Sequence, residues 1–312
     1  MKNIFKIMAM MLVLIGVSAC GKQEAESNDG KLEIVTSFYP MYEFTKQVTK
    51  DKANVSMLID GGVETHDYEP SAKDMAKIQN ADVFIYNSNE METWVEAVLK
   101  NIDTSKVKVI EASKGIELLG GEEEQADHDD HDHEDGHSHV YDPHVWLDPV
   151  LAKKEVETIS EGIMSVDKEN SDYYKKNTED YGNQLTELHE SYVSTLKDAK
   201  NRKFVTQHTA FSYLAHEYDL EQVAISGLSP DQEPTPKELK GIQDLVKDEN
   251  IQVIYTESSA SEKIAKTISD ATGAKLAVLN PMESVSKENR QKGEDYISIM
   301  KANLEALSLS IN

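Results

Sequence analysis

"LEIVTSFYPMYEFTKQVTKDKANVSMLI", residues 32–59, holds two short apolar runs on either side of an amphipathic stretch. "LEIVTSF" and "NVSMLI" are typical of strands, and "YPMYEFTKQVTK" between them is typical of a helix. Two strands separated by such a helix predict a βαβ unit with parallel strands. The alternation continues to "KVKVIEA" (106–112) and resumes between "KFVTQ" (203–207) and "AKLAVLN" (274–280). The sequence therefore predicts an α/β fold with two lobes, each with a mostly parallel sheet flanked by helices.

A long helical pattern lies between the two regions of alternation. It covers "SDYYKKNTEDYGNQLTELHESYVSTLKDAK", residues 171–200, and at 1.5 Å per residue it would span roughly 45 Å. That length suits a connection between two lobes better than an ordinary crossover. We expect an N-terminal lobe over residues 32–166, a linking helix over 167–200 and a C-terminal lobe over 201–312.

The N-terminus is typical of a secretory signal peptide. "MKNIFKIMAMMLVLIGVSACGK" has basic residues at its start, then an apolar run too short to cross a membrane, then small residues before Cys20. "VSAC" resembles the lipobox of bacterial lipoproteins, although Val17 replaces the usual Leu. We expect removal of residues 1–19, lipidation of Cys20 and a flexible polar tether over residues 20–31. Cys20 is the only cysteine, so an intrachain disulfide and a cysteine-type zinc site are excluded.

The charge of the chain excludes one class of partner. Acidic residues outnumber basic ones by 57 to 32, which gives a formal net charge of −25. A phosphate-rich partner would be repelled, so we expect no nucleic acid partner. Apolar residues make up 39% of the chain, which is enough for a core outside the most acidic stretch.

Residues 120–139 combine many acids with histidines and contain no bases. The stretch has no apolar periodicity, so we expect a mobile insertion in the N-terminal lobe. Neutral imidazoles coordinate metal ions, and the carboxylates raise the local concentration of cations. We therefore expect an auxiliary loop that collects metal weakly, with a solvated spacer as the alternative. Its histidines are His128, His131, His133, His137 and His139.

Four potential metal ligands follow predicted strands. His66 comes after "NVSMLI", His144 after "KVKVIEA" and the insertion, His208 after "KFVTQ", and Glu283 after "AKLAVLN". In open parallel sheets, ligands bind beyond the carboxyl ends of the strands. The four side chains could therefore surround one ion between the lobes. Three imidazoles and one carboxylate suit tetrahedral Zn²⁺, whereas Mn²⁺ would favour more oxygen ligands.

Each of these residues has an alternative role. A lone histidine in such a loop usually lies on the surface, and Glu257, after "IQVIYT", competes with Glu283 for the fourth position. His189 is expected to be solvated on the long helix, and His216 is expected to serve packing. Each ligating imidazole also needs a carboxylate or carbonyl at its other nitrogen. The candidates for that role are Glu64, Asp67, Asp142 and Asp148.

Five motifs resemble one family along the chain from Leu32 to the end. They are "THDYEPS" (65–71), "DPHVWLDP" (142–149), "QHTAFSYLAHEY" (207–218), "GLSPDQEPTPKEL" (227–239) and "LNPMES" (279–284). The sequence is similar to the zinc-binding solute proteins of bacterial ABC importers, the zinc branch of the zinc/manganese (cluster A-I) family. The resemblance implies two lobes joined by a rigid helix, with His66, His144 and His208 as ligands and Glu283 as the fourth. Manganese relatives carry Glu at the position of His208 and Asp at that of Glu283.

The resemblance also implies a function. We expect a lipid-anchored, monomeric receptor on the extracytoplasmic face of the membrane, which captures Zn²⁺ and delivers it to a permease. The permease and its ATPase would be separate chains, and the receptor would catalyse nothing. The alternatives are a manganese or iron receptor of the same family, a surface metal buffer or adhesin, and a zinc hydrolase. The hydrolase is disfavoured because the sequence contains neither an HExxH nor a GxSxG motif.

Overall fold

The computed structural model describes residues 30–120, 141–258 and 260–311. The described residues from Leu32 onward belong to one compact unit. The predicted signal peptide, Cys20 and most of the predicted tether lie outside the described residues. So do the histidines of the acidic stretch, namely His128, His131, His133, His137 and His139.

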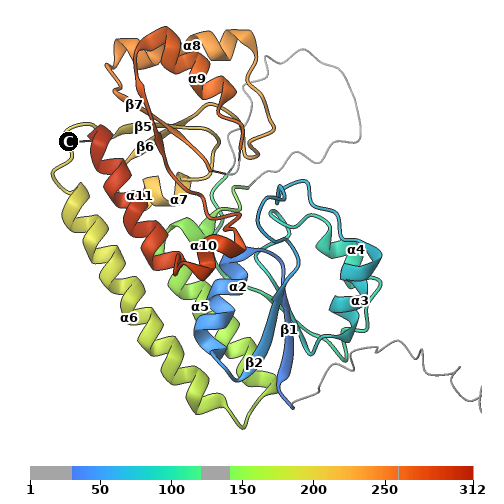
Figure 1. Cartoon of the computed structure of the whole chain (residues 1–312). Coiled ribbons are helices and arrows are strands. Elements are labelled where there is room, and N and C mark those ends of the chain that lie inside the picture. Colours follow the sequence, from blue (N-terminus) through green and yellow to red (C-terminus); the bar gives the residue numbers. More distant parts are fainter. Residues whose placement is uncertain (1–29, 121–140, 259, 312) are drawn as a thin grey trace, which may run out of the picture. The chain divides into compact units, whose positions relative to one another are not determined.

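Two parallel four-stranded sheets form the framework (Figure 1). The first contains β1 (Leu32–Thr36), β2 (Ala53–Met57), β3 (Val83–Tyr86) and β4 (Lys108–Glu111). The second contains β5 (Lys203–Thr206), β6 (Glu221–Ala224), β7 (Val253–Thr256) and β8 (Lys275–Val278). The strand orders are β2-β1-β3-β4 and β6-β5-β7-β8, so both sheets have the same topology. The winding direction reverses between β1 and β3 and between β5 and β7, and such switch points are where open sheets bind ligands. The predicted fold class is confirmed.

Helices flank the sheets. They are α2 (Tyr39–Thr49), α3 (Ala72–Asn80), α4 (Val95–Leu99), α5 (Pro149–Val166), α6 (Ser171–Leu196), α7 (Ser212–Glu217), α8 (Pro236–Asp248), α9 (Lys263–Thr272), α10 (Lys287–Gln291) and α11 (Tyr296–Ile311), with a 3₁₀ turn η1 (Val145–Leu147). Capping boxes begin α3 at Ser71 and α8 at Thr235, where the side chain of each cap accepts the backbone N–H three residues on. The stretch "METWVEAVLKNI" (91–102) predicts a helix from Met91, whereas α4 begins at Val95. The elements η1 and α10 were not predicted, because elements this short have no measurable periodicity.

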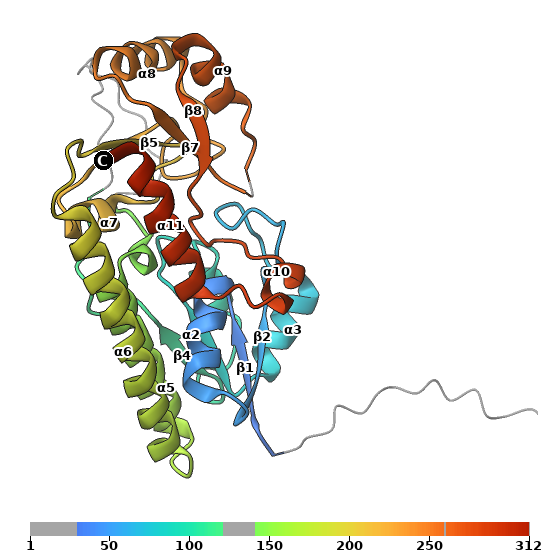
Figure 2. The same ribbon diagram turned by 60° about the vertical axis from the view of Figure 1, so that its left-hand side comes forward.

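The long helix α6 contains 26 residues and would span about 39 Å. It packs along α5 and leads into β5 (Figure 2). The C-terminal helix α11 packs against α6 and β5, and the ring of Tyr296 lies 5.1 Å from that of Phe44 on α2. Elements from the two ends of the chain therefore share one core. The predicted lobe boundaries near residues 166 and 201 stay predictions.

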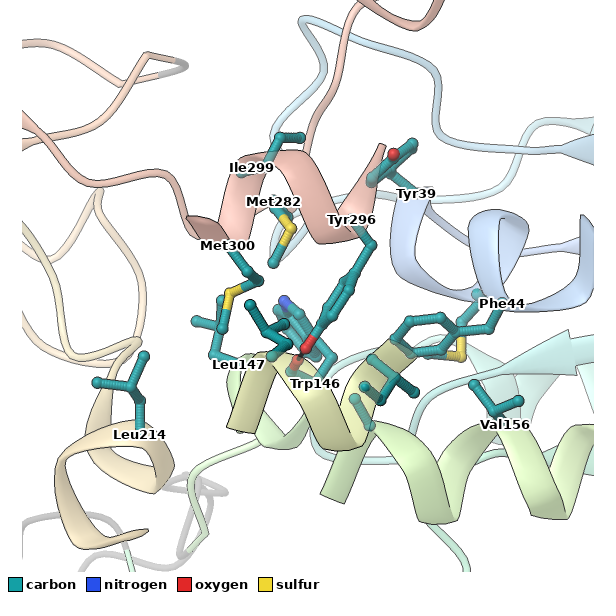
Figure 3. Packing of buried hydrophobic residues seen from close by; sticks show 14 of the residues in the cluster. Tyr39, Phe44, Trp146, Leu147, Val156, Leu214, Met282, Tyr296, Ile299 and Met300 are labelled. Atoms are coloured by element: carbon teal, nitrogen blue, oxygen red, sulfur yellow. Dashed lines mark hydrogen bonds between the residues drawn. The ribbon is translucent and has the colours of Figure 1, made fainter. Parts of the chain in front are cut away.

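The main hydrophobic core joins residues of α2, α5, α6 and α11 with the segments around Trp146 and Met282 (Figure 3). Two smaller clusters lie between the first sheet and α3–α4 and between the second sheet and α8–α9. Among the helices that the structure describes, none combines the length and apolar character needed to cross a membrane.

Candidate metal centre

His66, His144, His208 and Glu283 come together in one cluster. His66 lies between β2 and α3, His144 directly before η1, His208 two residues after β5, and Glu283 between β8 and α10. Each of the four offers one ligand atom, and these atoms all lie within 4.8 Å of one another. The structure thus brings together the four residues that the sequence singled out, although they come from four separate loops at the carboxyl ends of strands.

The distances from Glu283 to the three imidazoles suit a tetrahedral ion. Oε1 of Glu283 lies 3.1 Å from Nε2 of His208, 3.3 Å from Nε2 of His144 and 3.6 Å from Nε2 of His66. Zn–N bonds near 2.0–2.1 Å place the ligand atoms of a tetrahedron about 3.3 Å apart. The Nε2 atoms of His66 and His144 are buried without a hydrogen-bond partner among the described residues. A cation between the rings would satisfy both atoms, which buried polar groups require.

Burial closes the cluster from solvent on most sides. The side chains of His144 and His208 are 0% exposed, that of Glu283 is 4% exposed and that of His66 is 10% exposed. Four protein ligands complete a tetrahedral shell, whereas a catalytic zinc keeps one position open for water. The arrangement therefore suits holding an ion better than hydrolysis at it.

Two buried carboxylates orient two of the imidazoles. Oδ1 of Asp142 lies 2.8 Å from Nδ1 of His144, and Oε1 of Glu257 lies 2.6 Å from Nδ1 of His208. Each carboxylate also accepts the backbone N–H of its histidine. A carboxylate at Nδ1 keeps the proton there and turns the Nε2 lone pair towards the ion.

Glu257 therefore lies behind His208, and Glu283 occupies the fourth position of the cluster. Of the other acids considered for orienting an imidazole, Glu64 accepts the backbone N–H of His66 at 3.2 Å. Asp148 instead caps α5 by accepting the N–H of Val150. In the described part of the chain, no carboxylate is hydrogen-bonded to the ring of His66.

The acids around the cluster shift the pKa values of its members. Burial alone would lower the pKa of His208, but the carboxylates of Glu257 and Glu283 outweigh it and raise the pKa to about 10. Asp142 and Glu283 likewise outweigh burial and raise the pKa of His144. Burial would raise the pKa of Glu283, yet the facing histidines hold it well below its usual range. A cation entering this site must therefore displace protons from the imidazoles.

The two remaining histidines of the described chain lie elsewhere. His189 on α6 contacts the hydroxyl of Tyr218 at 3.2 Å, and His216 is exposed on α7. His189 was expected to be solvated, and its side chain is 28% exposed. His216 was expected to serve core or surface packing, and its exposed position on α7 excludes the core.

Two cavities adjoin the cluster. One of about 480 Å³ is lined by Glu64, Asp231, Glu233 and Glu283 among others. The other, of about 200 Å³, is lined by His66 and shares Asp231 with the first. The acids of this lining outnumber its one base, Lys263, so the larger cavity carries net negative charge, which concentrates cations at the cluster.

Comparisons with known proteins agree with this geometry. A family model described as "Zinc-uptake complex component A periplasmic" (ZnuA) matches residues 34–309. The chain belongs to the ZnuA family. Members of the ZnuA family are solute-binding proteins of transport systems. The resemblance that the five motifs predicted is confirmed.

Relatives of this ZnuA-family chain are named for zinc. The "High-affinity zinc uptake system protein ZnuA" of Bacillus subtilis (strain 168) is 50% identical over 319 residues, covering 99% of this chain and 97% of that protein. The "Zinc-binding lipoprotein AdcA" of Streptococcus pneumoniae (strain ATCC BAA-255 / R6) is 49% identical, and the chain spans 60% of its length. The crystal structure of the Zn(II)-bound ZnuA-like domain of S. pneumoniae AdcA has a TM-score of 0.77 and 46% identity. The match covers 90% of this chain and 99% of that domain.

Proposed function

We propose that the protein captures Zn²⁺ outside the cell and delivers it to an ABC-type metal permease. The observation that carries the proposal is the arrangement of three Nε2 atoms around Oε1 of Glu283, at 3.1–3.6 Å. These three distances are close to the separation of about 3.3 Å between the ligands of one small tetrahedral ion, and all four ligand atoms lie within 4.8 Å of one another. His66, His144, His208 and Glu283 are accordingly the proposed ligands, and Asp142 and Glu257 orient His144 and His208.

Zinc is favoured over manganese as the cargo. Three of the four donor atoms are imidazole nitrogens, which suit Zn²⁺, whereas Mn²⁺ prefers more oxygen donors and a higher coordination number. The relatives' names for zinc uptake and zinc binding support the same choice. With Glu283 in the fourth position, no site remains for the water that a zinc hydrolase activates, so the protein acts as a binding protein without catalysis.

The receptor is placed at the extracytoplasmic face of the membrane. The signal peptide over residues 1–19 and the lipid on Cys20 would anchor it there, and the tether would let the folded unit reach the permease. The permease and its ATPase are separate chains in this proposal, and the receptor is a monomer. A relative named as a zinc-binding lipoprotein supports the anchor.

The acidic histidine-rich segment is proposed as an auxiliary collector. Gly120 and Tyr141, directly outside residues 121–140, pair in an antiparallel bridge, so the residues that flank the segment lie side by side. A short linker can therefore replace the segment without separating His144 from the fold.

Competitive titration with Zn²⁺ and Mn²⁺ tests the proposal. The mature protein is compared with a variant in which a short linker replaces residues 121–139. We expect one tight zinc site in both proteins, a preference for Zn²⁺ over Mn²⁺ in both, and weaker additional zinc binding only where the segment is present. Loss of the tight site with the segment would contradict the assignment of the ligands, and a preference for Mn²⁺ would contradict the assignment of the cargo.

A further inference from the structure

Trp146 connects the segments that carry two of the proposed ligands. It lies two residues after His144, its side chain is fully buried, and its indole N–H donates to the carbonyl of Pro281 at 2.8 Å. Pro281 lies two residues before Glu283. The hydroxyl of Tyr296 donates to the backbone carbonyl of Trp146 at 2.7 Å, and Figure 3 shows Tyr296 and Trp146 packed together. One side chain thus links the turn of His144 to the turn of Glu283.

The turn that carries Glu283 is itself strained and held by hydrogen bonds. Met282 has φ of +59°, in the left-handed region that non-glycine residues rarely adopt. Its N–H donates to Oδ1 of Asn280, and the amide side chain of Asn303 pairs with both the N–H and the C=O of Asn280. The bond from the indole to Pro281 completes this set, so the backbone on both sides of Asn280 is fixed.

The indole ring also lies against the ligand imidazole. The centroid of the indole ring is 5.2 Å from that of His144 and 4.9 Å from that of Phe38. The planes of the Phe38 and Trp146 rings meet at an angle of 74°. The hydrogen bond is buried, so its loss would leave the carbonyl of Pro281 unpaired away from water, which is costly. We therefore expect the turn of His144 and the turn of Glu283 to move only together.

We propose that Trp146 is a positioning residue that sets the separation between His144 and Glu283, and thereby the coordination geometry that the ion meets. This inference rests on the proposed function. A separation of 3.3 Å between Nε2 of His144 and Oε1 of Glu283 suits the short bonds of a tetrahedral ion. An ion that takes more oxygen ligands would need the two turns to move apart. Trp146 therefore contributes to selectivity as well as to affinity.

The chain offers a matched control, since it contains only two tryptophans. Trp94 is 5% exposed, and its indole nitrogen has no hydrogen-bond partner among the residues that the structure describes. Trp146→Phe and Trp94→Phe therefore make the same change in size at two buried sites, but only the first removes a hydrogen bond. The full mature chain is used for both variants.

Three quantities are measured for each variant. They are the Zn²⁺ dissociation constant by competition with a chelator, the ratio of Zn²⁺ to Mn²⁺ affinity, and the visible absorption of the Co²⁺-loaded protein. The absorption of Co²⁺ is intense only in tetrahedral sites, so it reports the geometry independently of stability. We expect Trp146→Phe to weaken zinc binding roughly 10-fold or more, to reduce the preference for Zn²⁺ and to weaken the Co²⁺ bands. Trp94→Phe should leave all three quantities within about twofold of the native values.

Equal zinc affinity and equal Co²⁺ spectra for the two variants would overturn the proposal and leave Trp146 with a packing role only. If Trp146→Phe does not fold, Tyr296→Phe decides, because it removes only the hydroxyl bonded to the carbonyl of Trp146. We expect that variant to weaken zinc binding about threefold to 10-fold with the same spectral change, and unchanged binding and spectra would overturn the proposal. Absence of a tight zinc site in the native protein would instead refute the proposed function, so it is measured first.

Discussion

Replacement of Glu257 by glutamine tests how the site obtains its affinity. Oε1 of Glu257 lies 2.6 Å from Nδ1 of His208, and the side chain is 3% exposed. Glu257→Gln keeps the shape and one acceptor oxygen but removes the negative charge. Charge-assisted hydrogen bonds are about twice as strong as neutral ones, and a change at a carboxylate behind a ligand histidine typically costs about 10–100-fold in metal affinity. We therefore expect zinc binding to weaken by roughly 1.4–2.8 kcal/mol.

The size of this loss should depend on pH. Glu257 also favours a proton on His208, whose pKa is raised to about 10 by Glu257 and Glu283 against the effect of burial. Removing the charge of Glu257 lowers that pKa, so fewer protons compete with zinc below pH 10. Protons compete with zinc for His208 most strongly at low pH. The weaker competition in Glu257→Gln therefore offsets more of the lost zinc affinity at pH 6 than at pH 8. Competition with a chromogenic chelator at pH 6, 7 and 8 measures the difference.

Glu288→Gln is the control for the change in net charge. Glu288 is 76% exposed and pairs with Lys292 on the surface, so its replacement should leave zinc affinity unchanged at every pH. Native affinity in Glu257→Gln at all three pH values would refute the reasoning. A loss that is larger at pH 6 than at pH 8 would also refute it, because the sign of the proton competition would be wrong.

Two further predictions concern the buried carboxyl group of Glu155 and the proposed ligand His66. Glu155 is fully buried, both its carboxylate oxygens lack partners in the described chain, and burial, with Glu92 adding to it, raises its pKa well above the usual range. Above about pH 4.5 this carboxylate is ionised in the unfolded chain and must bind a proton on folding, which lowers the free energy of unfolding. Glu155→Gln removes that cost, so it should raise Tm by roughly 2 °C or more at pH 8 and hardly at pH 4. Thermal unfolding, with the exposed Glu157→Gln as control, measures this, and equal shifts at both pH values would contradict it. His66→Ala should weaken zinc binding less than His208→Ala, because of these two rings only that of His208 has a buried carboxylate at Nδ1 in the described chain. A titration showing the reverse order would contradict this.

The sequence was most informative where the signal is local. Each apolar run singled out as a strand coincides with a strand of the structure, for example residues 203–207 with Lys203–Thr206 of β5. The same runs located the histidines, because a residue that follows a strand of a parallel sheet lies at its ligand-binding edge. Short elements were the failures, as at Met91, where a turn stands in place of the first turn of the predicted helix. A stretch of four or five residues contains too few positions to distinguish a helix from a turn.

By itself, the sequence determined the alternation of strands and helices and the chemistry of the candidate ligands, since both depend on residue type and on neighbours along the chain. It preferred Glu283 for the fourth position but left Glu257 as a competitor. Only the tertiary structure placed Glu257 at Nδ1 of His208 and Glu283 at Nε2, and only it showed that Trp146 reaches Pro281. These acids lie 49 and 75 residues from His208 along the chain. Which side of the imidazole each one meets depends on how the strands and loops pack, and no local pattern encodes that.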